Sequence, residues 1–210
     1  MTRRHFRDIL MRMKVAFTAL VMALASVPAL AAESAFDLGF ARPGMTLADF
    51  RAFGWPTDVS VRCSGEDDLP PESETVRLAV PRPIAKLGGL RCGLFSHDQA
   101  GWHPYGLELA GNPSEIWGKF FPDRDGIPRL VQLVIKQPPQ GFAALADHFT
   151  TSFGPPGQRD GHLARWESGD AEATIIEDGS KSLLAFIIDT RLQAALNARM
   201  THQPGAKAVH

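Results

Sequence analysis

Two histidines and a carboxylate lie close together near the middle of the chain, at His97, Asp98 and His103. Imidazole and carboxylate groups bind zinc and act as general bases in hydrolases. A metal site needs at least three converging ligands, and the serine-nucleophile patterns G-x-S-x-G and S-x-x-K do not occur in the sequence. We therefore predict a solvated turn here. The alternative is a periplasmic hydrolase or metal-dependent enzyme with a site near these three residues.

A second acidic group, Asp123-Arg-Asp125-Gly126, shares letters with the start of a calcium-binding loop. It lacks the later oxygen ligands and the closing glutamate, whereas an Asp-Gly pair before an apolar run is typical of a β-hairpin, which we predict. His148 falls on a predicted helix surface with no nucleophile beside it, and no glycine-rich nucleotide-binding motif occurs. We predict no catalytic residue, no metal and no cofactor, and hence no enzyme.

The chain has only two cysteines, Cys63 and Cys92. In an oxidising compartment such a pair forms a disulfide. The loop between them is rich in glycine and proline and carries the acidic run Glu66 to Asp68, so it needs a covalent tie to hold its shape. A redox-active pair is the alternative, but the sequence has neither C-x-x-C spacing nor a flanking cation to lower a thiol pKa.

The first 31 residues have the pattern of a signal peptide: a basic start, an apolar run from Val15 to Val27, and Ala29-x-Ala31 as the cleavage site. A retained membrane anchor is the alternative, because residues 15–32 approach the length of a membrane span. No cysteine stands at the cleavage site, so no lipid anchor is expected. We predict a periplasmic or secreted protein that begins at Ala32, with no stable membrane insertion after cleavage.

Removal of the leader changes the net charge from −1 to −5, since Lys+Arg falls from 22 to 17 and Asp+Glu from 23 to 22. Nucleic acids and anionic lipids bind surfaces with clustered Lys and Arg. The acidic mature chain therefore excludes nucleic acid as an expected partner.

Helical and alternating apolar patterns follow one another twice. Residues 45–53 and 141–153 predict helices that end at Gly-Trp-Pro and Gly-Pro-Pro. Each is followed by predicted strands: 59–63, 90–95, 105–109, 114–121 and 129–136 after the first, and 163–167, 171–176 and 183–188 after the second. Residues 190–200 predict a terminal helix.

These patterns predict an α+β fold, an antiparallel sheet with helices packed on one face, made of two tandem helix-plus-strands units. The expected domains are residues 1–31 (signal peptide), 32–137 (first unit, with the disulfide loop), 138–200 (second unit) and 201–210 (disordered tail).

Two patches resemble a known group of proteins. Gly44-Met45-Thr46-Leu47 opens a helix that ends in Phe53-Gly54-Trp55-Pro56, and Phe149 to Phe153-Gly154-Pro155-Pro156 leads to Trp166 in the next strand. This is similar to the small periplasmic modules grouped around the β-lactamase inhibitor protein and the BamE lipoprotein, and to other exported bacterial proteins. The resemblance implies helices on an antiparallel sheet and a role in binding other proteins without catalysis. The chain lacks the lipidation cysteine of BamE.

Aromatic residues with a polar end often anchor protein interfaces. Trp117 and Trp166 lie in strand patterns and are expected inside the protein, whereas Trp55 and Trp102 lie next to Gly or Pro in turns. We predict an interface at Trp55, Trp102 and Tyr105, together with the acidic run Glu66 to Asp68. The overall prediction is a non-catalytic protein-binding module of the cell envelope, whose partner is an envelope protein.

Overall fold

The computed structural model describes residues 35–67, 69, 78–178 and 181–201. The predicted signal peptide, most of the predicted tail and Asp68 of the acidic run lie outside the described residues. The described residues belong to one compact unit. Within the described ranges, no helix is long and apolar enough to cross a membrane.

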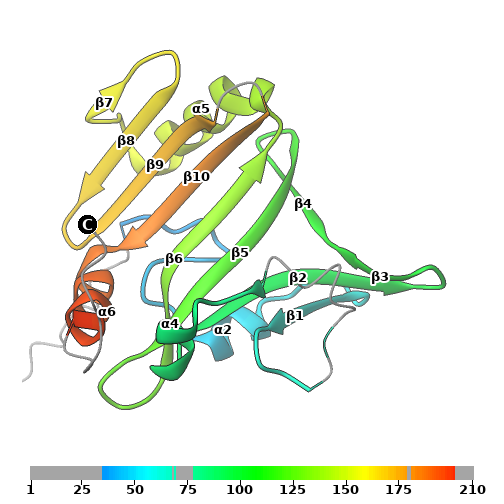
Figure 1. Ribbon diagram of the computed structural model, residues 1–210. Helices are drawn as coiled ribbons and strands as arrows, with labels where there is room; N and C mark the ends of the chain where they lie inside the picture. The colour runs from blue at the N-terminus through cyan, green and yellow to red at the C-terminus, as the bar shows by residue number, and fades with distance from the viewer. Residues whose placement is uncertain (1–34, 68, 70–77, 179–180, 202–210) are drawn as a thin grey trace, which may run out of the picture. The chain divides into compact units, whose positions relative to one another are not determined.

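Ten antiparallel strands form a single sheet, so the predicted antiparallel sheet and mixed α+β content are confirmed (Figure 1). The main path runs β1-β2-β5-β6-β10-β9-β8-β7, while β3 pairs with β2 and β4 with β5. The strands are β1 (Val59–Cys63), β2 (Leu90–Asp98), β3 (Gly101–Pro104), β4 (Gly106–Leu109), β5 (Asn112–Pro122), β6 (Pro128–Gln137), β7 (Gln158–Arg159), β8 (Leu163–Ser168), β9 (Ala171–Asp178) and β10 (Ser182–Asp189).

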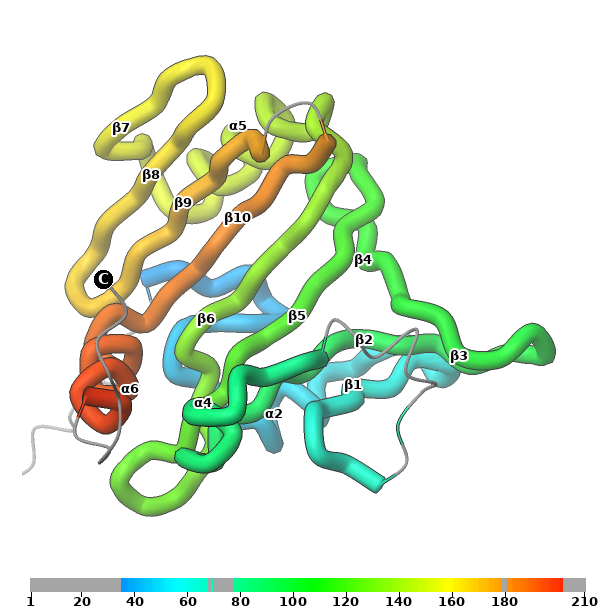
Figure 2. Tube along the Cα trace, in the orientation of Figure 1, coloured from blue at the N-terminus to red at the C-terminus, as the bar shows by residue number. Residues whose placement is uncertain are grey.

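The strands on either side of α5 (Phe142–Phe153) belong to this same sheet, because β10 pairs with β6 (Figure 2). In their register Leu133 stands opposite Ile187 and Ile135 opposite Ala185, and all four side chains are buried. Alternating apolar residues on these central strands create one buried face, which explains how the second group of strands continues the first.

Two helices cover the buried face. Helix α2 (Leu47–Ala52) begins at Thr46, whose hydroxyl accepts the Asp49 N–H at 3.0 Å, as expected of an N-cap. It contributes Leu47 and Phe50 to the main core, and α5 contributes Phe142, Leu145, Ala146 and Phe149.

A tryptophan indole donates a hydrogen bond to the C-terminal end of each of these two helices, from Trp55 just after α2 and from Trp166 on strand β8. The Trp55 indole N–H donates to the Phe50 carbonyl at 2.8 Å, and the Trp166 indole N–H donates to the Gly154 carbonyl at 2.9 Å. Carbonyls at a helix end lack partners within the helix. The Gly-Trp-Pro and Gly-Pro-Pro…Trp patterns thus mark the ends of the two helices, and in each case the tryptophan supplies a hydrogen bond to a carbonyl near that end.

Helix α6 (Thr190–Thr201) packs on the opposite face, which corrects the prediction that the helices pack on one face. Its Leu196 forms a second cluster with Phe121 and Val131, whereas their chain neighbours Phe120 and Leu130 belong to the main core. Successive residues of a strand point to opposite faces, so β5 and β6 present apolar side chains to both. The apolar side chains on the second face must also be shielded from water, and α6 shields them.

Several boundaries differ from the sequence interpretation. The predicted helix at 45–53 is shorter, Leu47–Ala52, and the strand expected at 90–95 extends to Asp98 and continues through a hairpin into β3. Helix α4 (Arg82–Lys86), the 3-10 turn η2 (Pro139–Gly141) and β7 were not predicted. Helix α6 extends to Thr201, the first residue of the predicted tail.

Candidate functional site

The histidine group lies on the exposed β2–β3 hairpin. Asp98 Oδ1 lies 3.3 Å from His103 Nε2 and accepts the Ala100 N–H at 2.7 Å. The hydrogen bond from Ala100 is the main cause that lowers the pKa of Asp98, and the contact with His103 lowers this pKa further. His97 instead stacks against Trp102, with ring centroids 4.8 Å apart. Across the described parts of the chain, no group of three His, Cys, Asp or Glu side chains could hold a metal.

The acidic group at Asp123 forms the predicted hairpin turn between β5 and β6. Asp123 Oδ1 accepts the N–H groups of Asp125 and Ile127 at 2.9 and 3.0 Å, and Oδ2 accepts Arg129 Nε at 2.6 Å. The hydrogen bond from Arg129 is the largest cause that lowers the pKa of Asp123. Its oxygens are thus engaged in holding the turn.

The predicted disulfide between Cys63 and Cys92 is present. Both cysteines are buried, at 1% and 0% exposure, and they join two directly paired residues of β1 and β2. A buried bond within the sheet has the position of a structural cross-link, since redox-active cysteines are partly exposed.

Glu66, the first residue of the predicted acidic interface, contacts the residues around the Cys63–Cys92 disulfide. One carboxylate oxygen pairs with Arg51 Nη2, and the other accepts the Cys63 N–H at 3.0 Å. The Arg51 guanidinium also lies 3.4 Å from the Cys63 sulfur. Glu66 therefore joins α2 to the end of β1, while Asp67 remains exposed.

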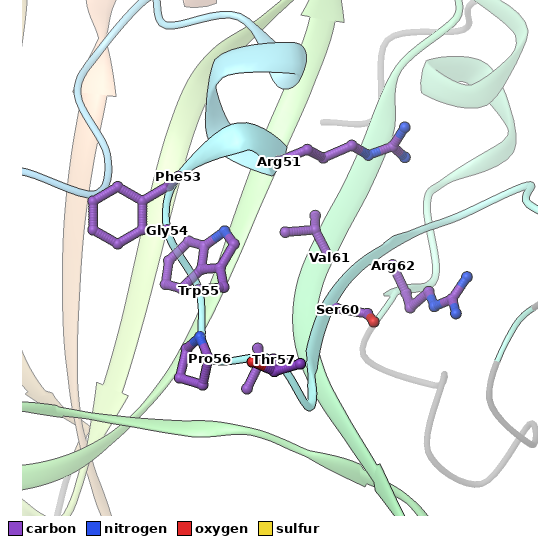
Figure 3. Close-up of a pocket in the computed structure, with 10 residues that line it drawn as sticks. Arg51, Phe53, Gly54, Trp55, Pro56, Thr57, Ser60, Val61 and Arg62 are labelled. Carbon is purple, nitrogen blue, oxygen red and sulfur yellow. The ribbon is translucent and has the colours of Figure 1, made fainter.

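An open groove of about 480 Å³ lies between the end of α2 and strand β1. Figure 3 shows Phe53, Trp55 and Pro56 following one another along the connection, with Arg51 and Arg62 extending away from the rings. Phe53 is 41% exposed, and Trp55 is half-buried. The groove thus combines apolar aromatic surface with two arginines that have partners of their own: Arg51 pairs with Glu66, and Arg62 stacks on Trp102.

The aromatic wall of this groove is held from behind. The Phe53 and Trp55 rings meet at 4.7 Å, and the buried rings of Phe40 and Phe50 lie 5.9 and 5.5 Å from Trp55. Edge-on and tilted ring contacts of this kind are favourable geometries for aromatic pairs. Together with the Trp55 hydrogen bond to Phe50, these contacts hold the Trp55 ring against the core beside the groove.

Strand β1 ends the main path of the sheet, so no described strand pairs with its outer edge. Ser64 N–H donates to the Arg91 carbonyl at 2.9 Å. Hydrogen-bonded and non-hydrogen-bonded residue pairs alternate in an antiparallel ladder. The backbone N–H and C=O groups of Arg62 and Ser60 therefore also form their hydrogen bonds with β2. Val59, Val61 and Cys63 then direct their backbone groups outward, and the short 4.0 Å Cα distance of the Cys63–Cys92 pair agrees with a non-bonded position.

Two of these outward N–H groups have local partners. The Val59 N–H donates to the Pro56 carbonyl at 2.9 Å, and the Cys63 N–H donates to Glu66. In the described part of the chain, the Val61 N–H and C=O and the Val59 C=O remain available at the outer edge. Both valines line the groove.

The three aromatic residues of the predicted interface do not form one patch. Trp55 lines the groove. Trp102 lies on β3, where the Arg62 guanidinium stacks 4.8 Å from its ring centroid. Tyr105 is partly buried and packs against the main core. Arg62, which both lines the groove and covers Trp102, is the link that the sequence interpretation missed. Its position opposite Gly93 follows only from the strand register.

No protein-family profile, curated protein or solved structure matches this chain.

Proposed function

We propose that this protein is a non-catalytic binding module of the cell envelope that captures an extended segment of a partner protein along strand β1. The observation that carries the proposal is the outward-facing backbone of Val59 and Val61 beside the aromatic groove. An extended peptide that adds to a sheet edge gains affinity from main-chain hydrogen bonds and specificity from pockets for alternate side chains.

The groove sets the side-chain pattern of the partner. Val59 and Val61 lie on the face of Phe53 and Trp55, whereas Ser60 and Arg62 lie on the other face. A paired strand places alternate residues on these two faces. The partner segment should therefore carry apolar residues on the aromatic side and polar residues beside Ser60 and Arg62.

Export of the protein is part of this proposal. It is supported by the signal-peptide pattern of residues 1–31 and by the disulfide, which persists in oxidising compartments. The resemblance to the β-lactamase inhibitor protein and BamE modules supports the same class of function. Intact-mass measurement of the protein secreted by a bacterial host tests export, with Ala32 as the expected first residue; a full-length product with free thiols contradicts it.

Selection of peptides from a random display library against the oxidised protein tests the binding function. We expect enriched peptides with apolar and polar residues in alternation, which compete with one another for one site. Enrichment of helical patterns, or of peptides whose binding is unaffected when Phe53 and Trp55 are replaced, contradicts strand addition at β1.

The alternative of a hydrolase or metal-dependent enzyme has one observation in its favour, the contact between His103 and Asp98. Hydrolysis of simple esters or peptides that is lost in His103→Gln and retained in His97→Gln would support that alternative over the binding module.

A further inference from the structure

A cavity of about 280 Å³ lies on the second face of the sheet, between α4, α6 and strands β2, β5 and β6. Helix α4 reaches this position because Gly88 and Gly89 turn the chain back on itself. Gly88 has φ +80°, and a Cβ at Gly89 would lie 2.4 Å from Ile84 Cγ2. Ile84 can therefore pack directly over the start of β2 and wall the cavity.

Two cations line the same cavity. Arg91 on β2 and Lys119 on β5 are direct cross-strand partners, so their side chains lie next to each other on one face. The Arg91 guanidinium also stacks over Trp117, 4.9 Å from the ring centroid. Like charges directly opposite each other destabilise a sheet, so this pairing calls for a compensating negative group.

No described carboxylate supplies that group. Ion pairs within 4.0 Å engage Arg51, Arg129 and Arg165 elsewhere in the described chain, but none engages Arg91 or Lys119. Arg91 Nε is buried without a hydrogen-bond partner. Loss of water lowers the pKa of Arg91 and of Lys119, and the nearby Arg91 charge lowers the pKa of Lys119 further.

The remainder of the wall is mainly apolar. It includes Ile84 from α4, Phe121 and Val131 from the sheet, and Leu196 from α6. A cavity of this volume is much larger than the space of a single water molecule, so it admits a small organic ligand. A ligand that matches this cavity therefore needs an anionic group for Arg91 and Lys119 and a short apolar chain for the remaining wall.

We propose that this cavity binds a small amphiphilic carboxylate, with its head group on Arg91 and Lys119 and its unbranched chain between α4 and α6. The planar guanidinium suits a two-point contact with a carboxylate, and the ammonium adds a point charge. The site shares no lining residue with the β1 groove, so it is a second site that does not depend on the proposed strand addition.

Calorimetric titration of the oxidised protein with sodium decanoate, below the concentration at which it forms micelles, tests this site. We expect saturable binding of one decanoate. Binding of 1-decanol should be weaker by about tenfold or more, since its hydroxyl cannot form the charge-assisted hydrogen bonds that a carboxylate forms with Arg91 and Lys119. Decanol that binds as tightly as decanoate, or no saturable decanoate binding, overturns the proposal.

Two variants and one control locate the ligand. Lys119→Met keeps the aliphatic stem and should weaken decanoate by about tenfold or more without weakening decanol. Gln193→Trp, from α6, should fill the cavity and weaken both ligands. Lys136→Met removes a lysine from β6 outside the cavity and should leave both affinities unchanged. Circular dichroism establishes that each variant is folded. Decanoate affinity that is unchanged in Lys119→Met or in Gln193→Trp contradicts the site.

Discussion

Cys63 and Cys92 stand directly opposite each other on β1 and β2, at a position where the two backbones exchange no hydrogen bonds. The disulfide thus fastens the last residue of the edge strand to its neighbour. It also fixes the register in which Val61 directs its backbone groups outward. The same bond therefore stabilises the fold and orients the proposed binding edge.

Replacement of both cysteines by alanine should lower the free energy of unfolding by about 3.5 kcal/mol, because the disulfide closes a loop with a sequence separation of 29. Urea unfolding of the oxidised protein and of the double variant measures the difference. Reduced protein of natural sequence is the control and should unfold close to the double variant. A loss below about 1 kcal/mol contradicts a structural role.

Asp123→Asn should destabilise the protein at neutral pH, because Asp123 holds the β5–β6 turn through Arg129 and two backbone N–H groups. Since folding lowers the pKa of Asp123, its stabilising contribution is complete above the unfolded pKa of about 3.9 and is lost as the pH falls through the folded pKa.

Thermal unfolding from pH 7 to acid pH measures this dependence. The difference in stability between the natural protein and Asp123→Asn should shrink as the solution becomes acidic. Asp125→Asn, in the same turn, is the matched control and should remain close to the natural protein at pH 7. A constant difference across the acid range would show that Asp123 does not act through its charge.

Gly118→Ala tests the packing of the sheet where β5 meets the main core. A Cβ at this position would lie 2.7 Å from Phe120 Cε2 and 2.9 Å from Leu130 Cδ1, so the variant should lose about 1–3 kcal/mol through overpacking. Gly106 also lies on a strand, but a Cβ there would come no closer than 3.9 Å to the Ser114 carbonyl oxygen, so Gly106→Ala is the control. Equal stability of the two variants contradicts the described register.

Local signals predicted much of the fold. The Asp-Gly turn between β5 and β6, the helix before Gly154 and the joining of Cys63 to Cys92 depend on neighbouring residues or on the only available pair. Strand β3 and the opposite face taken by α6 were missed. Strand β3 depends on a pairing with β2 that local patterns do not specify. The position of α6 depends on which face of the sheet the chain crosses after β10, and strands β5 and β6 have apolar residues on both faces.

The candidate sites were less predictable for the same reason. Trp55 could be picked out as an aromatic residue in a turn. The outward backbone of Val61 and the pairing of Arg91 with Lys119 arise only from the register between strands. Glu66 looked like part of an exposed acidic loop, but its carboxylate bridges Arg51 and the Cys63 backbone.

Phe53→Ala separates binding from stability. Phe53 is 41% exposed at the end of α2, so its loss should weaken selected peptides while changing the unfolding free energy by less than about 1 kcal/mol. Phe50 is fully buried on the same helix, so Phe50→Ala should instead lower the free energy of unfolding by about 3–5 kcal/mol. Peptide titration and urea unfolding of both variants provide the comparison. Unchanged peptide affinity in Phe53→Ala contradicts the groove as the binding surface.

The most direct measurement of strand addition is peptide affinity in Val61→Pro beside Val61→Ile. Proline removes the outward N–H that has no partner among the described residues and is tolerated on an edge strand. Isoleucine keeps that N–H and the apolar side chain. We expect Val61→Pro to weaken a selected peptide by about tenfold or more, and Val61→Ile to bind like the natural protein. Equal affinity of the folded Val61→Pro and Val61→Ile proteins for that peptide would contradict the account.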